Sequence, residues 1–117
     1  MKKPLYPNVN IVNSTSYAAT GVVVYAVCSD DDYSIDAGPG TSWTGPSRGG
    51  CLITKITAQL AVNGTFVNAT PYTSSGTSYS QFTIFQSNNS PLEFEVTRRT
   101  NAVSPVSDDA REAEPAE

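Results

Sequence analysis

The sequence of 117 residues contains no histidine. Histidine is the commonest general base in enzymes, the usual activator of a serine or cysteine nucleophile, and the commonest metal ligand. Catalysis would therefore have to rest on carboxylates, on Lys55, on a tyrosine or on a cysteine. The chain also lacks a catalytic motif, a phosphate-binding loop and a full set of metal ligands. We therefore expect a protein that is not an enzyme and that needs no cofactor.

Long hydrophobic runs are missing as well. No uninterrupted apolar stretch approaches the roughly 20 residues of a membrane-spanning helix, so no transmembrane segment is expected. The first residues, MKK, have the positive charge of a signal peptide, but prolines and asparagines follow where its apolar core should be. As written, the sequence predicts no secretory signal. It therefore predicts a cytoplasmic protein by default, with export that needs no leader as the alternative.

Charged residues are few, at 15% of the chain, and they are unevenly spread. Residues 100–117 carry five acidic side chains against Arg111 alone, whereas six basic and six acidic side chains cancel in residues 1–99. A neutral body without a basic patch argues against nucleic acid as a partner, because neutralising phosphates supplies most of that affinity. We expect one domain over residues 1–99 and a disordered acidic tail over residues 100–117.

The longest alternation of apolar and polar residues lies in the stretch 51–70. It predicts a strand over residues 51–62, with the even-numbered side chains on one face. Asn63 and Gly64 end this run, and Asn-Gly is favoured in a type I′ turn because both central residues need positive φ. A second extended segment over residues 65–70 completes a predicted hairpin.

Other strands are predicted from alternation or from runs of β-branched and aromatic residues. They cover residues 9–13, 22–28, 32–37, 79–86 and 92–98, with a fragment at 41–44. The run 22–28 is expected to be a central, buried strand. Turns or loops are expected at residues 14–20, 45–50, 71–78 and 87–91. No window before residue 100 has helical periodicity, so we predict an all-β fold: an antiparallel β-sandwich, or a small barrel, of seven to eight short strands.

Cys28 and Cys51 are the only cysteines, and each lies at the edge of a predicted strand. The sequence leaves two alternatives open, which are two buried thiols and a disulfide bond across the fold. A bridge would add about 3 kcal/mol where the native geometry allows it. Metal binding and redox chemistry are not favoured, because the chain has no CxxC motif and no histidine.

Four aspartates stand close together in the stretch DDDYSID. Carboxylates at alternate positions are the ligands that Ca²⁺ takes from a binding loop, so Asp30, Asp32 and Asp36 are the candidates for a metal site. The match to a calcium loop fails at Ile35, where glycine is needed, and at Thr41, where glutamate is needed. The simpler interpretation, a solvated strand edge that its charges protect from pairing, predicts no metal.

Two regions carry aromatic and polar side chains suited to recognition. Trp43 lies in PGTSWTGPSRGG, and an exposed indole can stack on a sugar ring or enter a membrane interface. Arg48, in the same stretch, can offer contacts to hydroxyl or phosphate groups. Tyr72 and Tyr79 belong to PYTSSGTSYSQ, which ends at Gln81 and has the composition of a recognition loop. The alternatives are that the indole caps one end of the sandwich and that the second stretch is an ordinary connector.

These features favour a non-enzymatic, lectin-like binding module that recognises a glycan or a lipid headgroup through loops at one end of the sandwich. Its contact residues are expected to be Trp43, Arg48, Tyr72, Tyr79 and Gln81. The alternative is a structural subunit that pairs with copies of itself, as a homo-oligomer, or with another protein. Its basis is that residues 22–27 and 79–85 carry apolar side chains on both faces.

Overall fold

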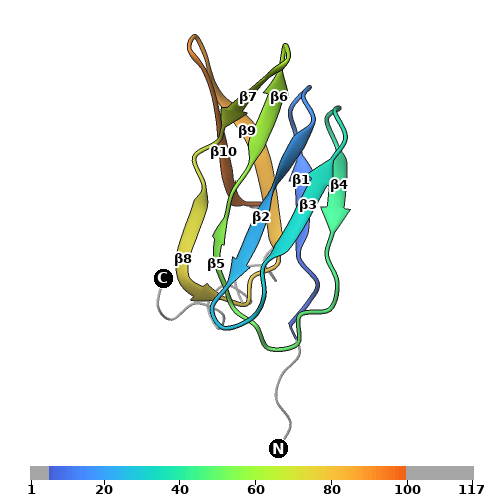
Figure 1. Cartoon of the computed structure of the whole chain (residues 1–117), viewed down its shortest axis with the longest axis vertical. Helices are drawn as coiled ribbons and strands as arrows, with labels where there is room; N and C mark the ends of the chain where they lie inside the picture. Colours follow the sequence, from blue (N-terminus) through green and yellow to red (C-terminus); the bar gives the residue numbers. More distant parts are fainter. Residues whose placement is uncertain (1–5, 100–117) are drawn as a thin grey trace, which may run out of the picture.

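The computed structural model describes residues 6–99, which form ten strands and no helix (Figure 1). The strands are β1 Asn10–Asn13, β2 Ala19–Tyr25, β3 Asp31–Ile35, β4 Thr41–Thr44, β5 Ile53–Ile56, β6 Gln59–Val62, β7 Thr65–Asn68, β8 Tyr72–Thr77, β9 Gln81–Asn89 and β10 Leu92–Arg98. The all-β prediction is confirmed, with more strands than the seven or eight expected. The predicted acidic tail lies outside the described residues.

The strands form two sheets packed face to face (Figure 1). The smaller sheet has the order β10-β9-β1-β4. In the larger sheet β2 is central, with β3 on one side and β5 and β6 on the other. β8 pairs with β5, and β7 pairs with β6. The described strands pair antiparallel except β1 and β9, which are parallel. Apolar side chains from both sheets fill one core between them, so the sandwich prediction is confirmed.

The two sheets also meet along both edges. At one edge Thr70, between β7 and β8, donates its backbone N–H to the carbonyl of Phe94 and accepts from the N–H of Val96, both at 2.9 Å. At the other edge Trp43 of β4 packs on Tyr33 of β3, with ring centroids 5.4 Å apart. These contacts partly cover the edges of the sheets and limit pairing with another chain.

The predicted hairpin is present between β6 and β7. Asn63 and Gly64 have φ values of 50° and 81°, as a type I′ turn requires, and Val62 pairs with Thr65 across the turn. The amphipathic strand predicted at residues 92–98 also has the bounds that its alternation indicated.

The strand predicted over residues 51–62 is two strands, because β5 ends at Ile56 and β6 begins at Gln59. Ile53 and Ile56 are both fully buried although they are three positions apart, which unbroken alternation does not allow. A register shift in the pairing of β2 with β5 places the extra residue at Thr54, between Ile53 and Lys55. The predicted core face is therefore wrong before Ile56, and Leu52 is only half-buried.

The central strand β2 begins three residues earlier than predicted and ends at Tyr25. Its first residue, Ala19, pairs with Ile35 of β3 and with Leu60 of β6, and this pairing overrides the turn-like composition before Gly21. After Tyr25 the chain turns toward β3, which leaves Val27 91% exposed. The hydrophobic run therefore extends beyond the strand that it predicted.

Two expected connectors are largely strand. Residues 71–78 contain β8, whose pairing with β5 overrides the local preference of its serines and of Gly76 for turns. β9 continues to Asn89 through most of the turn expected at residues 87–91, because it stays paired with β10 as far as Leu92. Both corrections have the same cause, which is pairing with another strand.

Cys28 and Cys51 form a disulfide bond, with Cα atoms 6.2 Å apart. The bond links the β2–β3 loop to the segment before β5, and both cysteines are half-buried at the margin of the core.

Replacing both cysteines with alanine is expected to lower the free energy of unfolding by about 3 kcal/mol, because the unfolded chain regains the freedom that the bridge removes. The denaturation midpoint in urea without reductant measures the change. The parent protein treated with dithiothreitol should shift to about the same midpoint. A double variant as stable as the untreated parent would contradict this stabilisation.

Candidate functional site

The structure does not gather the five predicted contact residues into one loop site. Trp43, Tyr72 and Gln81 lie within strands β4, β8 and β9. Arg48 lies in the β4–β5 connection and Tyr79 in the β8–β9 connection, and both side chains are buried.

Arg48 is only 5% exposed, and its guanidinium binds the backbone instead of facing solvent. Its donors reach carbonyl oxygens of Ser78 (2.6 Å), Pro7 (2.9 Å), Cys51 (3.2 Å), Tyr79 (3.2 Å) and Thr77 (3.5 Å). Burial lowers the pKa of Arg48, and the carbonyl dipoles take the place of lost water. Arg48 therefore joins three separate segments of the chain and offers no surface to a ligand.

The two predicted tyrosines pack on the core rather than presenting open rings. The rings of Tyr79 and Tyr72 lie 5.8 Å and 4.8 Å from the ring of Phe82. The hydroxyl of Tyr79 donates to the carbonyl of Arg99 at 3.0 Å, and the guanidinium of Arg98 lies over the Tyr79 ring at 4.8 Å. Neither ring is available as a broad stacking surface.

Trp43 is half-buried in β4 and closes the edge of the sandwich against Tyr33. A Cβ atom on Gly45 would lie 2.6 Å from the indole, so the glycine makes room for the ring. Trp43 therefore packs on the body of the protein, as the alternative hypothesis predicted. It does so at the edge of a sheet and not at one end of the sandwich.

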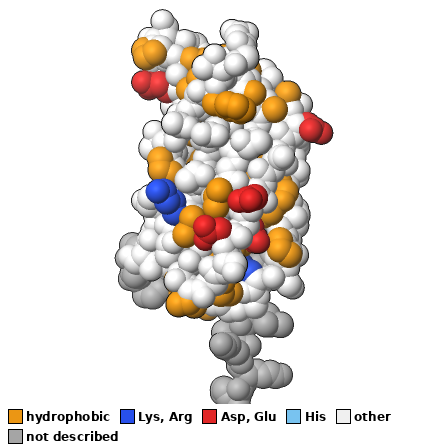
Figure 2. Space-filling model, in the orientation of Figure 1, with side chains coloured by type: hydrophobic (Ala, Val, Ile, Leu, Met, Phe, Trp, Pro, Cys, Tyr) orange, Lys and Arg blue, Asp and Glu red, His pale blue; other side chains and the backbone are white. Residues whose placement is uncertain are grey.

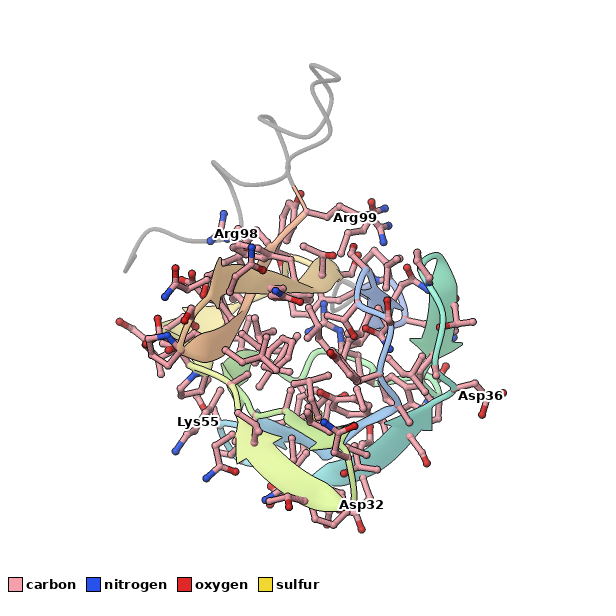
Figure 3. All side chains as sticks on the ribbon, turned by 90° about the horizontal axis from the view of Figure 1, so that it is seen from above. Asp32, Asp36, Lys55, Arg98 and Arg99 are labelled. Carbon is pink, nitrogen blue, oxygen red and sulfur yellow. A yellow bond between two sulfur atoms is a disulfide. The ribbon has the colours of Figure 1, made fainter. Side chains whose placement is uncertain are left out.

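The aspartates do not converge. Asp31 accepts a hydrogen bond from the Tyr25 hydroxyl at 2.9 Å, and burial followed by this bond raises the pKa of Tyr25. In Figure 3 the side chains of Asp32 and Asp36 lie well apart. Within residues 6–99 no three side chains of aspartate, glutamate or cysteine come together in a group that could hold a metal ion.

A groove of about 370 Å³ opens on the outer face of the larger sheet, where β5 breaks into β6. Lys55, Thr57, Gln59 and Asn68 give it polar walls, and small apolar residues of β2 and of the β7–β8 connection complete it. The break is held from the core side by Tyr33, whose hydroxyl donates to the Thr57 carbonyl at 2.6 Å. Burial raises the pKa of this phenol, which keeps it a donor. We call this groove, with the residues that line it, the larger-sheet groove.

Phe66 of β7 stands next to the larger-sheet groove and is 63% exposed. Phe66 pairs with Ala61. Two positions further along the same strands, Asn68 pairs with Gln59, and this pair also faces outward. Since alternate residues of a strand share a face, Phe66 lies about 7 Å along the strand from Asn68. The short Ala61 side chain leaves the ring uncovered. The amide of Gln59 donates to the Asn68 side-chain oxygen at 3.1 Å, which orients both groups.

Figure 2 shows several acidic and basic side chains across the middle of the visible face, with a largely uncharged area above them. Lys55 is the one charged residue among those that line the groove. An exposed aromatic ring, neutral amides and a hydroxyl therefore lie close together on this face. The sequence offered one sign of this arrangement, because the hairpin turn fixes Phe66 opposite Ala61.

Comparison with models of protein families, with characterised protein sequences and with solved structures found no match to this chain. Within the described part of the chain, no helix has the length and hydrophobicity to cross a membrane.

Proposed function

We propose that the protein is a non-enzymatic, lectin-like module that binds a glycan on the outer face of its larger sheet. The observation that carries the proposal is the exposed ring of Phe66 beside the amides of Asn68 and Gln59. This location replaces the loop site that the sequence suggested, because Arg48 and Tyr79 are buried.

The chemistry of these groups matches that of a pyranose ring. One face of the sugar presents C–H groups that pack on an aromatic ring, while its hydroxyls both donate and accept hydrogen bonds. The side-chain amides of Gln59 and Asn68 can do the same, and Lys55 adds a donor. All four side chains project from paired strands, so little conformational freedom would be lost on binding.

The disulfide bond supports the same proposal. Disulfides persist in oxidising compartments, such as cell surfaces, where glycans are displayed. The bridge between Cys28 and Cys51 would therefore suit a protein that works there.

Replacing Phe66 with alanine is expected to weaken glycan binding about tenfold or more, because the stacking surface is lost. A glycan array identifies the ligand, and isothermal titration with that ligand measures Kd for each variant. Val27→Ala, which removes another exposed apolar side chain, should bind as the parent does. Trp43→Ala tests the earlier loop hypothesis with the same titration.

An array on which the parent binds nothing would overturn the glycan proposal, as would equal binding by Phe66→Ala and the parent. Vesicles of neutral and of anionic lipids form a separate arm of the experiment. Binding to vesicles alone would assign the face to a lipid headgroup.

The second candidate function is assembly, because an exposed ring on a sheet face also suits contact with a second copy of the chain. Sedimentation equilibrium distinguishes the two functions. A dimer that Phe66→Ala dissociates would favour assembly, and a monomer at micromolar concentration would count against it.

A further inference from the structure

A row of polar side chains crosses the outer face of the smaller sheet, on the opposite side of the molecule from the groove. Gln81 of β9, Asn10 of β1 and Thr44 of β4 stand opposite one another in the strand register. Arg99 follows β10 and joins this row, since its backbone N–H donates to the carbonyl of Gln81 at 2.9 Å. Figure 3 shows Arg99 on the smaller sheet and Lys55 on the other one.

The Arg99 guanidinium is held in place by two neutral amides. One terminal nitrogen donates to the side-chain oxygen of Asn10 at 2.8 Å, and the other donates to that of Gln81 at 2.9 Å. Asn10 is itself fixed, because its amide nitrogen donates to the Thr44 hydroxyl at 2.9 Å. A guanidinium has five N–H donors, so these two bonds leave donors for a further acceptor.

The positive charge of Arg99 meets no carboxylate among the described residues. Its two side-chain partners are uncharged, and Glu95, the nearest acidic residue along the same strand, lies about 13 Å away by strand geometry. The local potential therefore favours an anion.

We propose that Arg99 anchors an oxyanion-binding site on the outer face of the smaller sheet, which takes a carboxylate or sulfate group of a ligand. A planar guanidinium held in one orientation offers paired N–H donors that match two oxygens of either group. Thr97, two positions before Arg99 on β10, contributes a hydroxyl on the same face. This site is separate from the larger-sheet groove, and neither proposal depends on the other.

Nuclear magnetic resonance titration of the full chain with sodium sulfate, sodium acetate and sodium chloride at constant ionic strength tests the site. Sulfate or acetate should shift the Arg99 Nε–H signal and the side-chain amides of Asn10 and Gln81 saturably, with Kd on the order of millimolar. Arg99→Gln should weaken binding about tenfold or more. Arg99→Lys, which keeps the charge but loses the planar fork, should weaken it several-fold.

Lys55→Gln is the matched control, because it removes one positive charge from the opposite sheet and should leave the titration unchanged. Comparison of the sulfate titration with the acetate titration shows which oxyanion binds more tightly. Shifts in the parent that do not saturate, or that chloride reproduces, would overturn the site. An equal loss in Lys55→Gln, or parent-like affinity in Arg99→Lys, would show general attraction of charge instead of an oriented guanidinium.

Discussion

Replacing Arg48 with methionine is expected to lower the free energy of unfolding by about 4 kcal/mol or more. Methionine keeps an unbranched apolar chain but removes every donor, so the buried carbonyls that Arg48 satisfies lose their charged partner. Each buried acceptor left without a hydrogen bond costs about 1 to 3 kcal/mol, and some regain water. Urea denaturation followed by tryptophan fluorescence measures the loss.

Two further variants isolate the cause. Arg48→Lys keeps the positive charge, but a single ammonium cannot serve carbonyls from three chain segments, so a loss of about 2 kcal/mol is expected. Lys55→Met removes an exposed cation and should change the free energy of unfolding by less than about 0.5 kcal/mol. If Arg48→Met were as stable as Lys55→Met, water would be replacing the guanidinium without loss.

Arg48 also shows why its site could not be predicted from the sequence. It lies in GPSRGG, a stretch of glycine, proline and serine that has the composition of an exposed loop. Its burial depends on Pro7, 41 positions before it, and on Tyr79, 31 positions after it. Local sequence patterns carry no information about acceptors at such separations.

The parts of the fold that were predicted are those that local sequence determines. The Asn63–Gly64 turn needs only two residues with positive φ, and the strand at residues 92–98 needs only its own alternation. β8 was missed because its serines favour turns in isolation and become a strand by pairing with β5. A strand whose partner lies far along the chain is decided by tertiary structure.

The candidate site likewise has one part that local sequence predicts and one part that depends on contacts between distant residues. The exposure of Phe66 follows from the hairpin register, which the sequence predicts. The larger-sheet groove lies at the break between β5 and β6, where Thr57 and Ala58 belong to neither strand. Thr57 at this break is packed against Gly21 of β2, a contact across 36 positions that no local pattern indicates.

Replacing Gly21 with alanine is expected to lower the free energy of unfolding by about 4 kcal/mol. An added Cβ would lie 2.0 Å from the carbonyl oxygen of Thr57 and 2.7 Å from the hydroxyl of Tyr33, so the backbone at Thr57 has to move. Overpacking of this kind costs up to about 3 kcal/mol, and losing the hydrogen bond between Tyr33 and Thr57 adds about 1 kcal/mol. The urea midpoint measures the sum.

Gly64→Ala is the control for a glycine replaced where there is room. No atom lies within 4 Å of its added Cβ, and its φ of 81° should cost only about 1 kcal/mol. Tyr33→Phe measures the lost hydrogen bond without the clash. Equal losses in Gly21→Ala and Gly64→Ala would mean that the backbone at Thr57 relaxes freely. A larger loss in Gly21→Ala, together with weaker glycan binding, would show that the contact between Gly21 and Thr57 shapes the larger-sheet groove as well as the fold.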